Sequence, residues 1–226
     1  MSLFSLEHGK LAYWSDFTFY GVAASALAGW VVFVSPRGHG VESAALVLLG
    51  LASWSLLEYV IHRFVLHGIA PFSGWHERHH SRPTALVSAP TVLSATLLAS
   101  LVFLPALALG GLWASSALFL GVLWGYLAYA VVHHATHHWR AGSAWSRRRK
   151  LWHALHHRHV ADGCCYGVIS GLWDQVFATG PGLAKDSQAV AVRGSSGSVP
   201  EQVPLKNPAS CCGEIPPPSL AAPVSA

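Results

Sequence analysis

The chain has 226 residues, of which 52% are hydrophobic and only 11% are charged, with a formal net charge of +4. Soluble domains carry about 25% charged residues, so this composition and a mean hydropathy of +0.40 exclude an ordinary soluble protein and indicate a membrane protein. The basic residues lie beside apolar stretches rather than together on a polar face, which argues against a nucleic-acid partner.

Residues 1–16 are expected to form an interfacial N-terminal segment, because Tyr13 and Trp14 suit the headgroup region of a bilayer. No cleavable signal peptide is evident there. Four apolar stretches follow, each long enough to be predicted as a membrane-crossing helix. They cover residues 17–34, 43–61, 85–109 and 112–132.

Only Gly110 and Gly111 separate the third and fourth stretches, which predicts a tight helical hairpin. Pro90 and Pro105 lie within the third stretch and predict a kink or a shorter crossing. The predicted fold class is therefore all-α: an integral membrane four-helix bundle, built by residues 17–182, with a His-rich helical cap on the cytosolic side.

Histidine is concentrated after the second and fourth apolar stretches, in three runs of the pattern H-x-x-H-H. Positions i, i+3 and i+4 share one face of a helix, so each run is predicted to aim three imidazoles at one point. Imidazole is a common ligand of transition metals, and the runs are therefore predicted to converge on a metal centre. The runs are His76-His79-His80, His134-His137-His138 and His153-His156-His157.

A wider pair, His62 and His67, precedes these runs. Residues five apart do not share a face of an ideal α-helix, so the helix is expected to end, bend or become extended here. Gly68 and Pro71 supply the break.

The predicted topology places every histidine run on one side of the bilayer, because an even number of crossings precedes each of them. Of the basic residues up to Arg158, only Arg37 falls on the opposite side. By the positive-inside rule the histidine side is cytosolic, facing the cytosol from the endoplasmic reticulum in a eukaryote or from the inner membrane in a bacterium.

The remaining residues are predicted to play smaller parts. Residues 161–182 are expected to pack on the cap, and residues 183–226, rich in Ser, Pro and Ala, to be disordered. The four cysteines form two vicinal pairs, Cys164-Cys165 and Cys211-Cys212, so a disulfide framework is not predicted. Palmitoylation of Cys211-Cys212 remains open.

The chemistry of the predicted centre follows from its ligands. Thiolates are absent from the runs, which argues against structural zinc. Iron is favoured on functional grounds, because a His-rich iron pair can use O₂ to oxidise an unactivated C–H bond. At the cytosolic mouth of an apolar bundle, it would meet a lipid tail from the bilayer and electrons from the aqueous side. Asp174 or Glu58 would accept a hydrogen bond from a ligand ring.

The histidine pattern resembles the fatty acid hydroxylase / sterol desaturase superfamily, and most closely its fatty acid 2-hydroxylases. Leu57-Glu58-Tyr59 before His62 and the run Gly171–Thr179 resemble the same branch. The resemblance implies a multi-pass membrane fold, two iron ions and O₂-dependent hydroxylation of a membrane lipid acyl chain; zinc can replace iron in preparations. The implied metal ligands are His62, His67, His76, His79, His80, His133, His137, His153, His156 and His157. Residues expected around these ligands are His134, His138, Glu58, Glu77 and Asp174.

Some relatives carry a fused cytochrome b5-like domain, for which this chain has no room. An external electron donor is therefore expected, such as a cytochrome b5-like protein or a ferredoxin. A carotenoid ring hydroxylase is the alternative within the enzyme class, but those enzymes usually carry H-D-x3-H where this chain has His133-His134-Ala135-Thr136-His137. A sterol desaturase-like enzyme also stays open. A membrane metal transporter or sensor is less favoured, because the runs lie beyond helix ends rather than at the bilayer midplane.

Overall fold

The computed structural model describes residues 9–87, 89–158 and 163–181, and the regular elements in these ranges are helices. The predicted disordered tail and residues 1–8 of the predicted N-terminal segment lie outside them. The helices are α1 (Lys10–Val34), α2 (Gly40–Val60), η1 (Ile61–Leu66), α3 (Phe72–Ser81), α4 (Thr91–Leu98), η2 (Ala99–Phe103), α5 (Leu104–His138), α6 (Ala144–Arg158) and α7 (Leu172–Val176).

Within these ranges, three continuous helical stretches are long and apolar enough to cross a membrane: Lys10–Val34, Gly40–Leu66 and Thr91–His138. The chain is therefore an all-helical membrane protein. The first stretch begins at Lys10, so the residues that the sequence assigned to an interfacial segment continue directly into the first apolar helix.

The third stretch is not straight. Gly111 has φ 72° and ψ 176°, a conformation that a residue with a Cβ rarely adopts. The rings of Phe103 and Phe119, on either side of it, approach to 5.2 Å between centroids, so the chain reverses direction at Gly111. The reversal lies where the sequence predicted a hairpin.

The third apolar stretch makes a shorter crossing than residues 85–109, one of the two outcomes that its prolines predicted. Helix α4 begins at Thr91 rather than near residue 85, and Pro90 precedes its first residue, so Pro90 starts a helix instead of kinking one. Pro105 follows the π-helical turn η2. Proline cannot donate the hydrogen bond that an α-helix requires four residues back, and the widened turn accommodates this loss.

Helices α2 and α5 pack closely through a pair of glycines. A Cβ on Gly50 would lie 2.0 Å from the carbonyl oxygen of Leu118, and one on Gly121 would lie 2.0 Å from that of Val47. Small residues let two membrane helices approach with their backbones nearly in contact. This contact fixes the end of α2, which continues into η1 with His62, relative to the end of α5, which carries His133 and His137.

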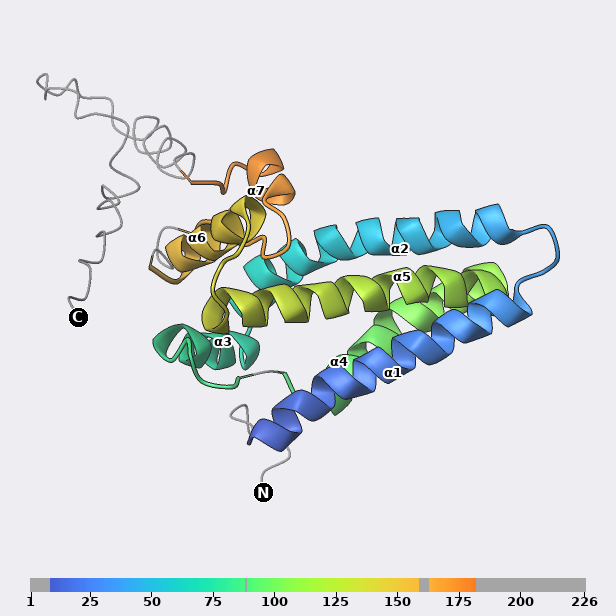
Figure 1. Cartoon of the computed structure of the whole chain (residues 1–226), viewed down its shortest axis with the longest axis horizontal. Coiled ribbons are helices and arrows are strands. Elements are labelled where there is room, and N and C mark those ends of the chain that lie inside the picture. Colours follow the sequence, from blue (N-terminus) through green and yellow to red (C-terminus); the bar gives the residue numbers. More distant parts are fainter. Residues whose placement is uncertain (1–8, 88, 159–162, 182–226) are drawn as a thin grey trace, which may run out of the picture.

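The shorter helices α3, α6 and α7 gather at one end of the long helices, where α2 and α5 finish (Figure 1). The turn between α1 and α2, which contains Arg37, lies at the opposite end. Large apolar side chains such as Phe33, Leu101 and Leu109 are exposed along the long helices, as expected for surfaces that face lipid. The histidine runs therefore meet at one end of an apolar bundle.

Candidate metal centre

Nine of the ten predicted ligands form two groups. Within each group, one ring nitrogen from each histidine lies within 4.8 Å of the corresponding nitrogens of the other members. The first group is His62, His67, His76, His80 and His156, and the second group is His79, His133, His137 and His153. Four helical elements contribute these histidines: η1 with its following residue, α3, α5 and α6, which meet where α2 ends.

His62 and His67 enter the first group through a π-helical turn. The α-helix ends here, at Val60, as the spacing indicated, but the chain does not become extended: it continues as η1, in which hydrogen bonds close between residues five apart. Residues separated by five positions then lie nearly above one another, and the two rings approach to 5.3 Å between centroids. The π-helical turn ends at Leu66, with His67 as its C-cap, just before Gly68 and Pro71.

The prediction that each H-x-x-H-H run aims three imidazoles at one point is wrong. In α3, His76 and His80 belong to the first group, whereas His79 belongs to the second. In α6, His156 belongs to the first group and His153 to the second. Neighbouring residues on an α-helix point about 100° apart, so a helix lying between the two groups supplies both.

His157 lies between the groups. Its Nε2 is 3.1 Å from Nε2 of His153, while its ring stacks on that of His80 with 4.2 Å between centroids. It does not lie within the 4.8 Å limit of either group, but it contacts a member of each. The ten predicted ligands therefore occupy one continuous cluster.

The Nε2 atoms face one another at short distances. Nε2 of His76 lies 2.9 Å from that of His62 and 3.0 Å from that of His80. Nε2 atoms of His67 and His156 are 3.1 Å apart. Neighbouring nitrogens lie about 3.0 Å apart in an octahedral set and about 3.4 Å apart in a tetrahedral one when metal–nitrogen bonds are about 2.1 Å. The separations fit an ion with five or six ligands better than a tetrahedral zinc site.

Two of these rings must present a lone pair to the group. Nδ1 of His62 donates to the carbonyl oxygen of Tyr166 at 2.5 Å, and Nδ1 of His156 donates to that of Cys164 at 2.9 Å. In a neutral imidazole only one nitrogen carries a proton, so Nε2 of both rings is an acceptor. Converging acceptors repel one another unless a cation lies between them, and the donor set therefore fits a metal ion.

Several buried ring nitrogens also lack a partner in the described part of the chain. They include both nitrogens of His79 and Nε2 of His133. A buried polar atom without a hydrogen bond costs about 1–3 kcal/mol, a cost that metal coordination would remove. These atoms lie in the second group, so this group too fits an ion.

Electrostatics keep the rings in the form that binds metal. Burial and repulsion from neighbouring histidines lower the pKa of His79 to about 3. Burial also lowers the pKa of His156 to about 3 and that of His157 to about 4. These imidazoles are neutral at pH 7, and neutral imidazole is the ligand form.

The two buried acids do not bind ligand rings directly, contrary to the prediction. Glu58 accepts the backbone N–H groups of Val168 and Ile169 at 2.6 and 3.0 Å. Asp174 accepts those of Tyr166 and Gly167, both at 2.8 Å. The acids bind the backbone of the segment whose carbonyls accept hydrogen bonds from the rings of His62 and His156. They therefore contact these rings indirectly, through that segment, and not directly as predicted.

The other three residues expected around the ligands lie elsewhere. Nδ1 of His134 is 3.0 Å from the hydroxyl oxygen of Tyr13, and its ring stacks on that of His138 at 4.4 Å between centroids. Both face α1 rather than the groups, and the ring of His138 approaches that of His137 only to 6.4 Å. Glu77 is exposed and makes no hydrogen bond with a histidine ring within the described part of the chain.

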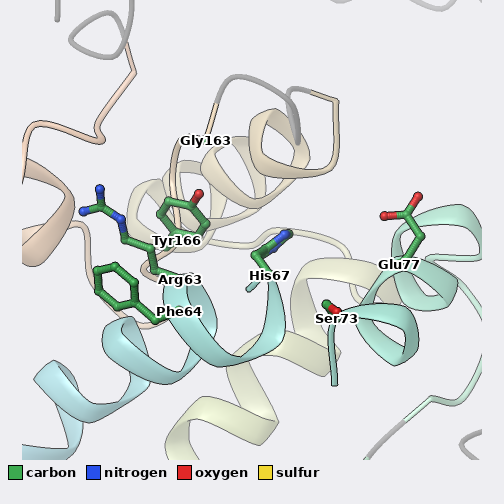
Figure 2. A pocket seen from close by; sticks show the side chains of 7 residues that line it. All are labelled: Arg63, Phe64, His67, Ser73, Glu77, Gly163 and Tyr166. Carbon is green, nitrogen blue, oxygen red and sulfur yellow. The ribbon is translucent and has the colours of Figure 1, made fainter. Parts of the chain in front are cut away.

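A pocket of about 410 Å³ opens beside the first group (Figure 2). His67 and Tyr166 lie at its inner wall, and the π-helical turn and α3 supply its sides. Its lining residues are Arg63, Phe64, His67, Ser73, Glu77, Gly163 and Tyr166. The pocket gives solvent and small solutes access to the edge of His67.

The residues that sequence reasoning missed act through their backbones. The carbonyls of Cys164 and Tyr166 orient two rings, and the Thr179 hydroxyl donates to Asp174 at 2.8 Å. A carbonyl is present at every position and leaves no trace in a side-chain pattern. Only the run Gly171–Thr179, singled out for its resemblance, pointed to this part of the chain.

Comparison with known proteins gives a consistent result. The family model described as fatty acid hydroxylase matches residues 47–179. The dihydroceramide fatty acyl 2-hydroxylases FAH2 and FAH1 of Arabidopsis thaliana are each 34% identical to the chain, over 149 and 151 residues. These alignments cover 61% and 62% of this chain and the same shares of the relatives. Human fatty acid 2-hydroxylase is 32% identical over 152 residues, covering 59% of this chain and 39% of the human protein.

A solved structure is also similar: scs7p, in which only the hydroxylase domain is visible. It matches with a TM-score of 0.65 and 26% identity, covering 74% of this chain and 66% of that one. The chain thus spans less than two thirds of the length of each of these proteins.

Proposed function

Because the chain belongs to the fatty acid hydroxylase family, we propose that it is a membrane enzyme that hydroxylates the acyl chain of a lipid with O₂ and two iron ions. The observation that carries this proposal is the meeting of two groups of neutral imidazoles at one end of an apolar helical bundle. The proposed ligands are the nine grouped histidines together with His157.

When bound, the two ions would supply O₂ activation and the oxidation of an unactivated C–H bond. Overall, one oxygen atom enters the product and the other leaves as water, which consumes two electrons and two protons. The chain itself contributes the position of the rings. His62 and His156 are held through Nδ1, so their Nε2 lone pairs point into the first group.

An acyl substrate is favoured over a carotenoid ring. The relatives described above are named as fatty acyl or fatty acid 2-hydroxylases. The bundle exposes apolar side chains along its length, so a lipid tail can lie beside it and reach the histidine end without leaving an apolar environment. We therefore propose a lipid acyl chain as the substrate.

We further propose that the chain crosses the membrane four times, with the histidine end in the cytosol. A straight helix of 48 residues would be about 72 Å long, well beyond the hydrocarbon core of about 30 Å. The reversal at Gly111 supports two crossings by Thr91–His138. Basic residues concentrate at the histidine end, which favours the cytosolic side.

A separate donor would supply the electrons from that side. The pocket beside His67 brings the aqueous phase to the edge of the first group, and this access supports electron entry there. A cytochrome b5-like protein or a ferredoxin is the proposed class of donor.

Expression in a host that lacks acyl hydroxylation tests the function. Mass spectrometry of the host lipids should detect hydroxylated acyl chains with the wild-type chain and none with His79→Ala. The same host, supplied with carotenoids, should show unmodified ionone rings. Hydroxylated rings without hydroxylated acyl chains would replace the proposal with its alternative.

A further inference from the structure

The two groups of histidines differ in the hydrogen bonds that their Nδ1 atoms make outside the group. In the first group, His62 and His156 donate Nδ1–H to the carbonyls of Tyr166 and Cys164. Both acceptors belong to one short segment, Cys164–Ile169. A ring fixed at Nδ1 cannot rotate, and its Nε2 keeps one direction whether or not an ion is bound.

The holding segment Cys164–Ile169 is itself fixed by two carboxylates, one at its middle and one at its C-terminal end. Glu58 of α2 accepts the N–H groups of Val168 and Ile169. Asp174 of α7 accepts those of Tyr166 and Gly167 through its two oxygens. Glu58 and Asp174 are 4% and 0% exposed, so water does not compete for these hydrogen bonds.

Further bonds tie Asp174 in place. The hydroxyl of Thr179 donates to one of its oxygens at 2.8 Å, and the same hydroxyl lies 3.0 Å from that of Tyr59 on α2. The holding segment is therefore attached to α2 and α7 by hydrogen bonds that do not involve the rings. The direction of His62 and His156 is set before any ion arrives.

The second group has no such support in the described part of the chain. Nδ1 of His79 and Nδ1 of His153 are buried without a hydrogen-bond partner, as is Nδ1 of His80 in the first group, but no ring of the second group is held as His62 and His156 are. Within the described residues none of the four rings donates to a backbone carbonyl, and the short contact of His153 is with Nε2 of His137, inside the group. These rings must be positioned by packing and by the ion itself.

We propose that the two metal positions are inequivalent: the first group is a preorganised site that binds its ion more tightly, and the second group is a weaker site that fills later. Glu58 and Asp174 are positioning residues for the first site, acting through the holding segment. Removing such outer partners typically lowers metal affinity about 10–100-fold. This inference rests on the two-metal part of the proposed function.

Titration of the metal-free, detergent-purified full chain with cobalt(II) tests the proposal. Cobalt(II) absorbs visibly when bound to nitrogen ligands, so each binding phase can be followed without turnover. We expect two phases of one ion per chain each, with dissociation constants at least about 10-fold apart. Binding of both ions in one phase of equal affinity would overturn the proposal.

Ligand variants assign the phases. His67→Ala should remove the tighter phase, and His137→Ala the weaker one. Loss of the weaker phase in His67→Ala would also overturn the proposal, since it would reverse the order of the sites.

Acid variants test the positioning role. In Glu58→Gln, the dissociation constant of the tighter phase should rise about 10–100-fold and that of the weaker phase should stay constant. Glu77→Gln is the matched control, because it removes the same charge next to His76 without touching the holding segment, and it should change neither phase. Equal weakening of both phases in Glu58→Gln would mean that the acid has only a general structural role and would overturn this assignment.

A milder variant and a parallel lipid measurement separate misfolding, and failure of the proposed function, from failure of this inference. If Glu58→Gln does not fold, Thr179→Val removes one donor to Asp174 and tests the same segment more mildly; the wild-type titration already decides whether the sites differ. Lipid products of the wild-type chain are measured in parallel. Hydroxylated lipids together with two equivalent metal sites would support the proposed function and overturn this inference. Inequivalent sites without hydroxylated lipids would support this inference and contradict the proposed function.

Discussion

His133 and His134 are neighbours in the chain, but their rings lie in different environments on either side of α5. The ring of His133 is 4.8 Å from those of His79 and His153, in the second group. The ring of His134 instead lies 5.2 Å from that of Trp14 on α1. The two residues therefore form a natural pair, one proposed ligand and one packing residue.

This pair gives the first prediction. His133→Ala should lower the yield of hydroxylated lipid more than about 100-fold, since loss of outer partners alone costs about 10–100-fold, and it should lower metal content. His134→Ala removes the bond with Tyr13, worth about 0.5–1.5 kcal/mol, and the ring contacts with Trp14 and His138, but no grouped ligand, and should keep metal content and product formation. Product and metal analysis of both variants checks this. An equal loss of product and metal in both variants would show that His133 and His134 do not have the different roles assigned to them here.

The close approach of α2 and α5 gives the second prediction. Gly121→Leu would place side-chain atoms against the backbone at Val47, and overpacking costs about 1–3 kcal/mol or more. It should lower the thermal unfolding temperature of the detergent-solubilised protein and lower metal content, because η1, which continues α2, and α5 carry ligands of different groups. Gly29→Leu is the control: a Cβ there meets nothing within 4 Å, and the unfolding temperature should barely change.

The third prediction concerns how the stability of the metal-free protein changes with pH. The pKa values of His79 and His156 are about 3 and that of His157 about 4, all below the value of about 6.5 in an unfolded chain. The unfolded state therefore takes up protons first, and the metal-free protein should lose stability progressively as the pH falls from about 6.5 towards 3.

Above pH 6.5 these groups are neutral in both states and stability should not vary through them. The thermal unfolding temperature of the metal-free protein at pH 7.5, 6 and 5 checks this, and bound metal should be released over the same range. A constant unfolding temperature between pH 7.5 and 5 would contradict the burial of these rings.

Truncation gives the fourth prediction. Deletion of residues 190–226 should leave turnover nearly unchanged, because their composition predicts no packed structure. Deletion from residue 171 onwards also removes Asp174 and Thr179, and metal content and turnover should both fall. Similar losses in the two truncations would show that the tail contributes to the active protein.

The fold could be predicted from the sequence as far as local patterns reach. Apolar length indicated membrane helices, and Gly110-Gly111 indicated the reversal that Gly111 makes with its positive φ. The start of α4 could not be placed, because hydropathy does not distinguish an apolar coil before Pro90 from the helix after it. The π-helical turn was missed because the spacing of His62 and His67 was judged against an ideal α-helix.

The candidate site could be predicted as a set of residues but not as an arrangement. The pattern H-x-x-H-H identified His76, His79 and His80, yet which ring faces which group depends on where α3 lies between them. Likewise His134 matched a run while its ring faces Tyr13. The packing of the helices against one another decides these directions, and the spacing of histidines along the sequence does not reveal that packing.

The central claim is that the two groups of histidines hold two iron ions that hydroxylate a lipid acyl chain. The most direct test is metal analysis of the chain purified from iron-supplemented cells, paired with mass spectrometry of the lipids of those cells. We predict two iron ions per chain and hydroxylated acyl products in the wild type, with both reduced in His79→Ala. Hydroxylated products that persist in His79→Ala at unchanged iron content would contradict the account.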